Sequence, residues 1–154
     1  MVKKQDQEFF RQLRELLEKP DDRPVRAGRL ARLIRDAGAY RWVGIYEVSG
    51  NEIAVVAWSG AGSPAFPRFP INQGLCGAAV ASGTTVRVGN VAKDPRYLTT
   101  FGSTRSEIVI PLKHSSDGKV VGLIDAESEQ LNAFTDDDQT FLEECARLTA
   151  AFWE

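Results

Sequence analysis

The sequence predicts an α+β domain with a central antiparallel β-sheet of about five or six strands. Three observations support this prediction. Two segments near the start of the chain have helical apolar periodicity, and a third lies at its end. Between them lie short runs of β-branched and aromatic residues separated by Gly, Asn, Asp and Pro. We therefore expect the terminal helices on one face of the sheet, and a loop with a short helix over the other.

The first two helices are predicted from their apolar spacing and from the residues that bound them. Residues 5–18 form an amphipathic helix that ends at Pro20. Asp22 is expected to cap a second helix, which Gly38 ends. Its apolar stripe comprises Ala27, Leu30, Leu33, Ile34 and Ala37. We read the chain as a single domain, 1–154, with a dimerising N-terminal helix at 1–20 and a core at 21–154.

The segment after the second helix has the composition of a β-hairpin. Residues 41–48 and 53–58 are rich in Val, Ile, Trp and Tyr, and the turn signal at 49–51 separates them. Pro64, Pro67 and Pro70 then favour an edge strand or a loop, because proline cannot donate to a central ladder.

A short helix of small residues is expected to begin at Gly74-Leu-Cys-Gly77 and to end at Gly83. Cys76 lies near its start, where free N–H groups and the helix dipole favour a negative charge. The sequence therefore makes Cys76 a candidate catalytic thiol with a lowered pKa. The alternative is a small buried apolar residue at a tight turn.

The rest of the chain alternates strands and connections and ends in a helix. Strands are predicted at 85–88, 107–112 and 119–127, with an Asp-Gly turn at 115–118. The long connection 89–106 is expected to act as a lid over a pocket. Thr135 caps the last helix, whose first turn carries Asp136, Asp137 and Asp138. Its expected apolar face comprises Phe141, Leu142, Cys145, Leu148 and Phe152.

Composition excludes several classes of function. The net charge of −2 argues against a nucleic-acid partner, and the arginines at 23–35 are expected to form a solvated helix face. No apolar run reaches the roughly 18 residues of a membrane span, and the charged N-terminus is no signal peptide. We therefore expect a cytoplasmic protein without a membrane partner. The two cysteines and single histidine match no metal-ligand spacing, so neither metal nor cofactor is expected.

Candidate ligand-binding residues lie on three of the predicted strands. Asp125 and Glu127 are two apart, so they share one face of their strand. They either line a pocket or form a solvated strand end. Trp42 and Tyr46 also share a face and either contact a ligand or belong to the core. Glu107 opens a third strand.

These patterns together resemble the GAF domain, a small-molecule-binding module. The resemblance covers residues 25–153 and rests on five pieces, at 74–80, 90–97, 107–112, 121–128 and 134–138. Pieces at 42–46, 74–77, 106–109 and 123–128 are most similar to free methionine-(R)-sulfoxide reductases. In that family the acidic positions matching Glu107, Asp125 and Glu127 help to hold the substrate amino group. That resemblance implies a pocket for an ammonium-bearing ligand.

The cysteines depart from the reductase pattern. That family has up to three, one of them in the Gly-x-Cys-Gly turn, which Cys76 matches. At the other two positions this chain has Phe66 and Thr100, and a hydroxyl cannot replace the attacking thiolate. We therefore expect a non-catalytic sensory domain that binds a small ligand, forms a homodimer and signals to a separate protein. The alternatives are a reductase with an altered cysteine set and a purely structural dimerisation module.

Overall fold

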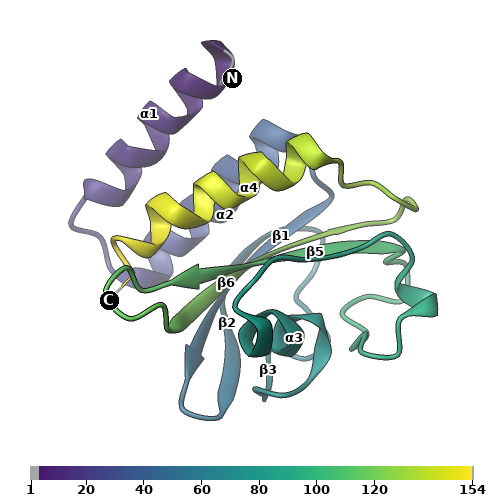
Figure 1. Cartoon of the computed structure of the whole chain (residues 1–154). Helices are drawn as coiled ribbons and strands as arrows, with labels where there is room; N and C mark the ends of the chain where they lie inside the picture. Colours follow the sequence, from purple (N-terminus) through teal and green to yellow (C-terminus); the bar gives the residue numbers. More distant parts are fainter. Residues whose placement is uncertain (1–3, 154) are drawn as a thin grey trace.

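A computed structural model describes residues 4–153 and shows three layers (Figure 1). Three helices lie on one side of a sheet, and a short helix with a long connection lies on the other. The helices are α1 (Lys4–Glu18), α2 (Arg23–Gly38), α3 (Gly74–Ser82) and α4 (Asp136–Ala150), with the 3₁₀ turn η1 (Val91–Lys93). The strands are β1 (Trp42–Ser49), β2 (Glu52–Gly60), β3 (Arg68–Pro70), β4 (Val86–Val88), β5 (Ser106–Lys113) and β6 (Val120–Ser128).

The sheet has six strands in the order β3-β2-β1-β6-β5-β4, and neighbouring strands are antiparallel. This confirms the predicted α+β class and strand number. The proline-flanked β3 is an edge strand, as its composition indicated. The two strands at the centre, β1 and β6, are covered on both faces, and most of their residues are buried.

The helical side holds the larger of two apolar cores. Buried residues of α2 and α4 pack there against the alternate residues of β1, β5 and β6 that point to this side. The apolar stripe of α1 also packs into this core, and Phe9 lies 4.9 Å from Phe141 between ring centroids. The apolar face of α1 is thus used within the chain.

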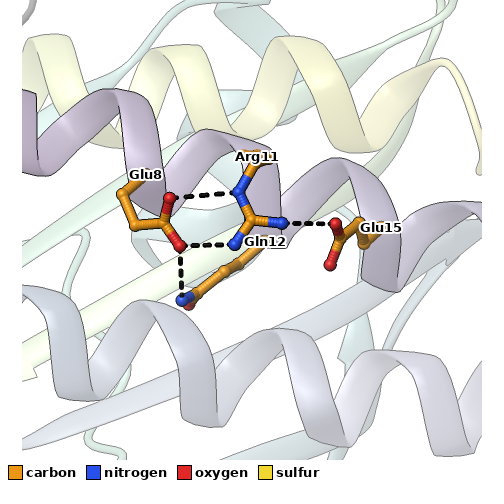
Figure 2. A network of polar contacts seen from close by, with 4 residues as sticks. All are labelled: Glu8, Arg11, Gln12 and Glu15. Atoms are coloured by element: carbon orange, nitrogen blue, oxygen red, sulfur yellow. Dashed lines mark hydrogen bonds and ion pairs between the residues drawn. The ribbon is translucent and has the colours of Figure 1, made fainter.

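The exposed face of α1 carries a polar network instead of apolar side chains (Figure 2). Arg11 pairs with Glu8 and Glu15, and Gln12 donates to Glu8. Exposed pairs of this kind contribute only about 0.3–0.5 kcal/mol each. They provide little apolar area for self-association, so the dimerising role of 1–20 stays a prediction.

The helix caps follow the sequence signals in part. Thr135 and Asp138 form a complete capping box at α4, which confirms the predicted start. Asp22 stands at the N-cap of α2, but its side chain makes no capping hydrogen bond. Gly38 is the last residue of α2, and Ala39, with φ of 54°, adopts the left-handed conformation.

Two side chains predicted to lie on apolar stripes are exposed. Ala37 faces solvent on α2, and Phe152 lies beyond the end of α4 at Ala150, where the chain turns. Trp153 is buried instead, and its Nε1 donates to the carbonyl of Val121 over 3.0 Å. Phe152 does not belong to the apolar face of the last helix, because that helix ends before Phe152.

None of the helices within residues 4–153 combines the length and the apolar character that a bilayer crossing requires.

Candidate functional site

The helix α3 brings Cys76 to the sheet face opposite the three large helices. Gly74 has φ of 75°, which a glycine adopts without strain at this helix start. Gly77 sits where a Cβ would lie 2.8 Å from the carbonyl oxygen of Ile71, so the chain entering α3 packs directly on the helix. Gly83 ends α3 in the left-handed conformation, as predicted. This close packing buries Cys76.

The strand register gathers three carboxyl groups on the same face. Glu107 of β5 lies opposite Glu127 of β6, and Asp125 lies two residues before Glu127 on the same face. Glu107, Asp125 and Glu127 are called the acidic cluster below. Across β6, Trp42 of β1 is the register partner of Glu127.

Val121 departs from the predicted alternation. It was expected to share the face of Asp125, but it packs against the core on the helical side. The reason is a register shift between Leu112 and Lys113, across which the partner on β6 changes from Gly122 to Val120. From Leu123 onward the side chains of β6 alternate as predicted, so the register shift does not change the face on which the acidic cluster lies.

The acidic cluster is buried. Its three residues are only 1–3% exposed to solvent. Thr104 donates to one oxygen of Glu127 over 2.9 Å. Oδ1 of Asp125 and Oε2 of Glu127 are buried, and no backbone N–H or basic side chain among the described residues donates to them. Asp125 hydrogen-bonds with the carboxyls of Glu107 and Glu127, which requires a proton on one carboxyl of each pair, and Thr100 is a further partner of Glu127. Two buried oxygens without a fixed cationic or amide donor are the clearest sign of a binding site.

Burial and mutual repulsion raise the pKa of each carboxyl in the acidic cluster. Burial is the main cause in all three, and the next is a neighbouring carboxylate: Glu127 for Glu107, Glu107 for Asp125, and Asp125 for Glu127. No basic side chain is among the groups that perturb them. The cluster therefore holds protons where isolated carboxylates would be charged.

Cys76 is buried, which agrees with the second of the two interpretations given for it above. Burial raises the pKa of Cys76 well above its ordinary value, and Asp125 and Glu107 raise it further. The dipole of the short helix α3 is outweighed because the thiol faces carboxylates in a buried environment. Cys76 Sγ and one carboxylate oxygen each of Glu107 and Asp125 lie within 4.8 Å of one another.

Two small pockets reach the acidic cluster. One contains Trp42 and Glu127 in its wall, together with Phe101 and Thr104. The other is lined by Tyr46, Phe66, Phe69, Gly74, Leu75, Cys76, Leu98, Thr100, Glu107 and Asp125. Each is small, with only about 20 Å³ available to the centre of a water molecule. All five residues predicted to bind a ligand thus lie on pocket walls, and their role in binding stays a prediction.

The connection between β4 and β5 covers this face of the sheet. It includes η1, and its Tyr97, Leu98 and Phe101 pack against the apolar core beneath. The ring of Phe101 meets that of Trp42 at 5.3 Å between centroids. The predicted connection 89–106 ends one residue early, because Ser106 already pairs with Ser128 in the sheet. Residues 89–105 are called the covering segment below.

The two residues that the sequence analysis matched to further reductase cysteines lie near Cys76. Phe66 and Thr100 both line the pocket that Cys76 also lines. Cys145 lies on the other side of the sheet in the helical core. Sequence reasoning did not find Thr104 or Phe101, although both belong to the connection singled out as a lid. A hydroxyl two residues before β5 was the only signal for Thr104.

Comparison with known proteins identifies the fold and its relatives. The GAF domain model matches residues 22–152. The Saccharomyces cerevisiae free methionine-R-sulfoxide reductase is 33% identical over 108 residues, which is 70% of this chain and 59% of that protein. Protein YtsP of Bacillus subtilis is 33% identical over 105 residues, 68% of this chain and 63% of its own length. The chain thus spans about six tenths of the curated relatives it matches.

A solved structure of a related protein has the same fold. The free methionine-R-sulfoxide reductase of Neisseria meningitidis, in complex with its substrate, superposes with a TM-score of 0.85 at 31% identity. That match covers 96% of this chain and 87% of the other. A family model matching most of the chain, together with the same layered fold, leads to one conclusion: the chain belongs to the GAF domain family of small-molecule-binding modules, and it is related to the free methionine-R-sulfoxide reductases.

Proposed function

We propose that this GAF domain binds a small metabolite through an ammonium group, as an amino acid would present it, and acts as a sensor without reductase activity. The observation that carries the proposal is the pair of buried oxygens on Asp125 and Glu127 that lack a cationic or amide donor. A buried ammonium group needs hydrogen-bond acceptors and compensating negative charge, and this pair supplies both when it releases its protons on binding.

The surroundings of the acidic cluster favour a cationic ligand over a neutral one. The groups that perturb the pKa of Glu107 and Asp125 are carboxyls, so no positive side chain already neutralises them. A bound ammonium group would relieve their mutual repulsion. The aromatic walls at Trp42 and Tyr46 are suited to the apolar part of such a ligand.

The thiols argue against reductase chemistry. A catalytic cycle on a sulfoxide needs an attacking thiolate and a second thiol that resolves the sulfenic acid. Cys76 is buried with a raised pKa, and Cys145 lies across the sheet in a separate core. At the two positions where we expect the family pattern to have further cysteines this chain has Phe66 and Thr100, and both line the pocket of Cys76.

A thermal-shift screen tests the binding proposal. Amino acids, simple alkylamines and matching carboxylic acids without an amine are compared at concentrations up to about 100 times Kd. Saturation at that level adds about 2.7 kcal/mol, or roughly 5–11 °C in Tm for a chain of this size. We expect shifts only from ligands that carry an ammonium group. No shift from any amine would refute the proposal and favour a purely structural module.

A pair of variants localises the binding. Glu127→Gln removes a charge from the acidic cluster and should weaken amine binding at least ten-fold. Glu15→Gln is the matched control, because Glu15 is exposed on α1 and pairs only with Arg11 (Figure 2). Equal loss in both variants, or in neither, would contradict the assigned site.

The rival activity has its own assay. Free methionine-(R)-sulfoxide is supplied with thioredoxin or glutathione as reductant, and turnover is followed in wild type and Cys76→Ser. We expect none. Turnover that disappears in Cys76→Ser would overturn the non-catalytic assignment. A homodimer and a separate downstream protein complete the proposed sensor, and the ordering of the covering segment on ligand binding would be its output.

A further inference from the structure

Cys76 and two members of the acidic cluster converge at one point on the pocket wall, although three elements supply them. The thiol comes from α3, and the carboxyls of Glu107 and Asp125 come from β5 and β6. Their ligand atoms lie within 4.8 Å of one another, and all three residues are buried. All three line the same pocket, so a small solute entering it can reach them.

A second observation shows that this point lacks a cationic partner. Oδ1 of Asp125 is buried, and no backbone N–H or basic side chain among the described residues donates to it. The hydrogen bonds of Asp125 with Glu107 and Glu127 join carboxyl groups, and the residue is 1% exposed. A carboxylate held in this way needs a proton or a cation to be stable. The nearest titratable groups are Glu107, Glu127, Cys76 and Tyr46, each of which is neutral or negative.

We propose that Cys76, Glu107 and Asp125 form a binding site for a divalent transition-metal ion of the Zn²⁺ type. One thiolate and two carboxylates supply three ligands, and the fourth position would face the pocket, as in zinc sites that keep an open position. The thiolate disfavours Mg²⁺ and Ca²⁺, which prefer oxygen ligands alone. This goes beyond ammonium binding, because it assigns the thiol and an inorganic ligand.

The spacing of the three atoms is compatible with such an ion. Zinc bonds of about 2.3 Å to sulfur and 2.0–2.2 Å to oxygen place tetrahedral ligands roughly 3.5 Å apart. The upper limit of 4.8 Å therefore requires an inward shift of at most about 1.3 Å. Side-chain rotation of Glu107, which has three torsions, is sufficient for much of it.

Binding has a defined proton balance. The Cys76 thiol gives up its proton as the S–metal bond forms, and each coordinating carboxyl that was protonated releases its proton too. The three ligand charges then face a divalent cation instead of each other. Affinity should therefore rise with pH. The ion also shares Asp125 and Glu107 with the proposed ammonium site, so metal and amine should compete.

Titration with Co²⁺ tests the proposal, because thiolate coordination gives a sulfur-to-cobalt charge-transfer band in the near ultraviolet. We expect the band in wild type to saturate at one ion per chain and to disappear when Zn²⁺ is added. Cys145→Ala is the matched control, since it removes a buried thiol outside the site and should keep the band. Cys76→Ser should lose the band and bind Zn²⁺ at least ten-fold more weakly.

Absence of the band in wild type would overturn the proposal, as would its persistence in Cys76→Ser. Circular dichroism checks that Cys76→Ser is folded. If it is not, Asp125→Asn provides the second test, with Zn²⁺ affinity expected to fall at least ten-fold and unchanged affinity counting against the site. Cobalt bound without the band, as by the exposed carboxylates at 136–137, also counts against it.

The two proposals fail separately. Glu127→Gln should weaken amine binding yet keep the cobalt band, since Glu127 is not one of the three metal ligands. Cys76→Ser should lose the band yet retain the amine-induced rise in Tm.

Discussion

Replacing Glu127 with glutamine tests whether the acidic cluster destabilises the unliganded protein. Burial and Asp125 raise the pKa of Glu127 from an ordinary value of 4.5 to about 10. Between these values the native state holds a proton that the unfolded chain releases. The contribution of Glu127 to stability is therefore fully present below the unfolded pKa and declines as pH rises toward the folded pKa. Glutamine cannot titrate, so the variant lacks this decline.

The magnitude follows from the shift. Each pH unit between the two pKa values costs about 1.36 kcal/mol. From pH 5 to pH 7, both within that interval, wild type should lose roughly 2–3 kcal/mol that Glu127→Gln keeps. Glutamine also fits the local geometry, because its oxygen can accept from Thr104 while its amide replaces Oε2. Any pH-independent change in unfolding free energy caused by the substitution is the same at both pH values, so it cancels when the two are compared.

Urea denaturation followed by tryptophan fluorescence at pH 5 and pH 7 provides the measurement. The difference in unfolding free energy between Glu127→Gln and wild type should rise by about 2–3 kcal/mol between the two pH values. The exposed control Glu15→Gln should stay within about 0.5 kcal/mol of wild type at both. A difference for Glu127→Gln that does not change with pH would refute the assignment of a buried, proton-holding carboxyl.

Three further outcomes follow from the same structure. Amine affinity should rise with pH, by up to ten-fold per unit for each proton that binding releases, and calorimetry in buffers of different ionisation enthalpy should detect that release. Native protein should react slowly with a thiol reagent and show two thiols after unfolding, since Cys76 and Cys145 are both buried with raised pKa values; rapid labelling would contradict this. Gly77→Ala should lower the unfolding free energy by about 1–3 kcal/mol, because the added Cβ would meet the backbone at 2.8 Å. Gly102→Ala has open space around the added Cβ and should stay within about 0.5 kcal/mol of wild type in the same urea titration.

Local chemistry was enough to predict the elements and part of the site. The helix cap at Thr135 depends on residues within one turn, and the common face of Asp125 and Glu127 depends only on the two-residue period of a strand. The edge position of the proline-flanked strand follows because each proline lacks the backbone N–H that a central strand donates to its neighbour. Each of these inferences uses interactions within a few residues of sequence, where spacing alone determines the geometry.

The remaining features depend on contacts between distant segments. The sequence left two interpretations of Cys76 open because the helix dipole is visible in it, whereas the carboxyls of Glu107 and Asp125, which raise the pKa of the thiol, are brought close only by the fold. The bulge that turns Val121 toward the helices has no sequence signal of its own. For the same reason the Cys76–Glu107–Asp125 grouping matched no ligand spacing, since its members are far apart along the chain.

The acidic cluster is difficult to explain as a device for stability. Three carboxyls face one another in a buried space, and their pKa shifts mean that folding becomes less favourable as the pH rises. An apolar or amide side chain would fill the same positions at lower cost. A cation reverses this balance, because binding replaces repulsion with attraction and stabilises the native state in proportion to occupancy. Thr104 of the covering segment donates to Glu127, so a ligand that binds Glu127 would also act on that segment. Destabilisation without a ligand and a direct contact with the covering segment are together what a ligand sensor requires.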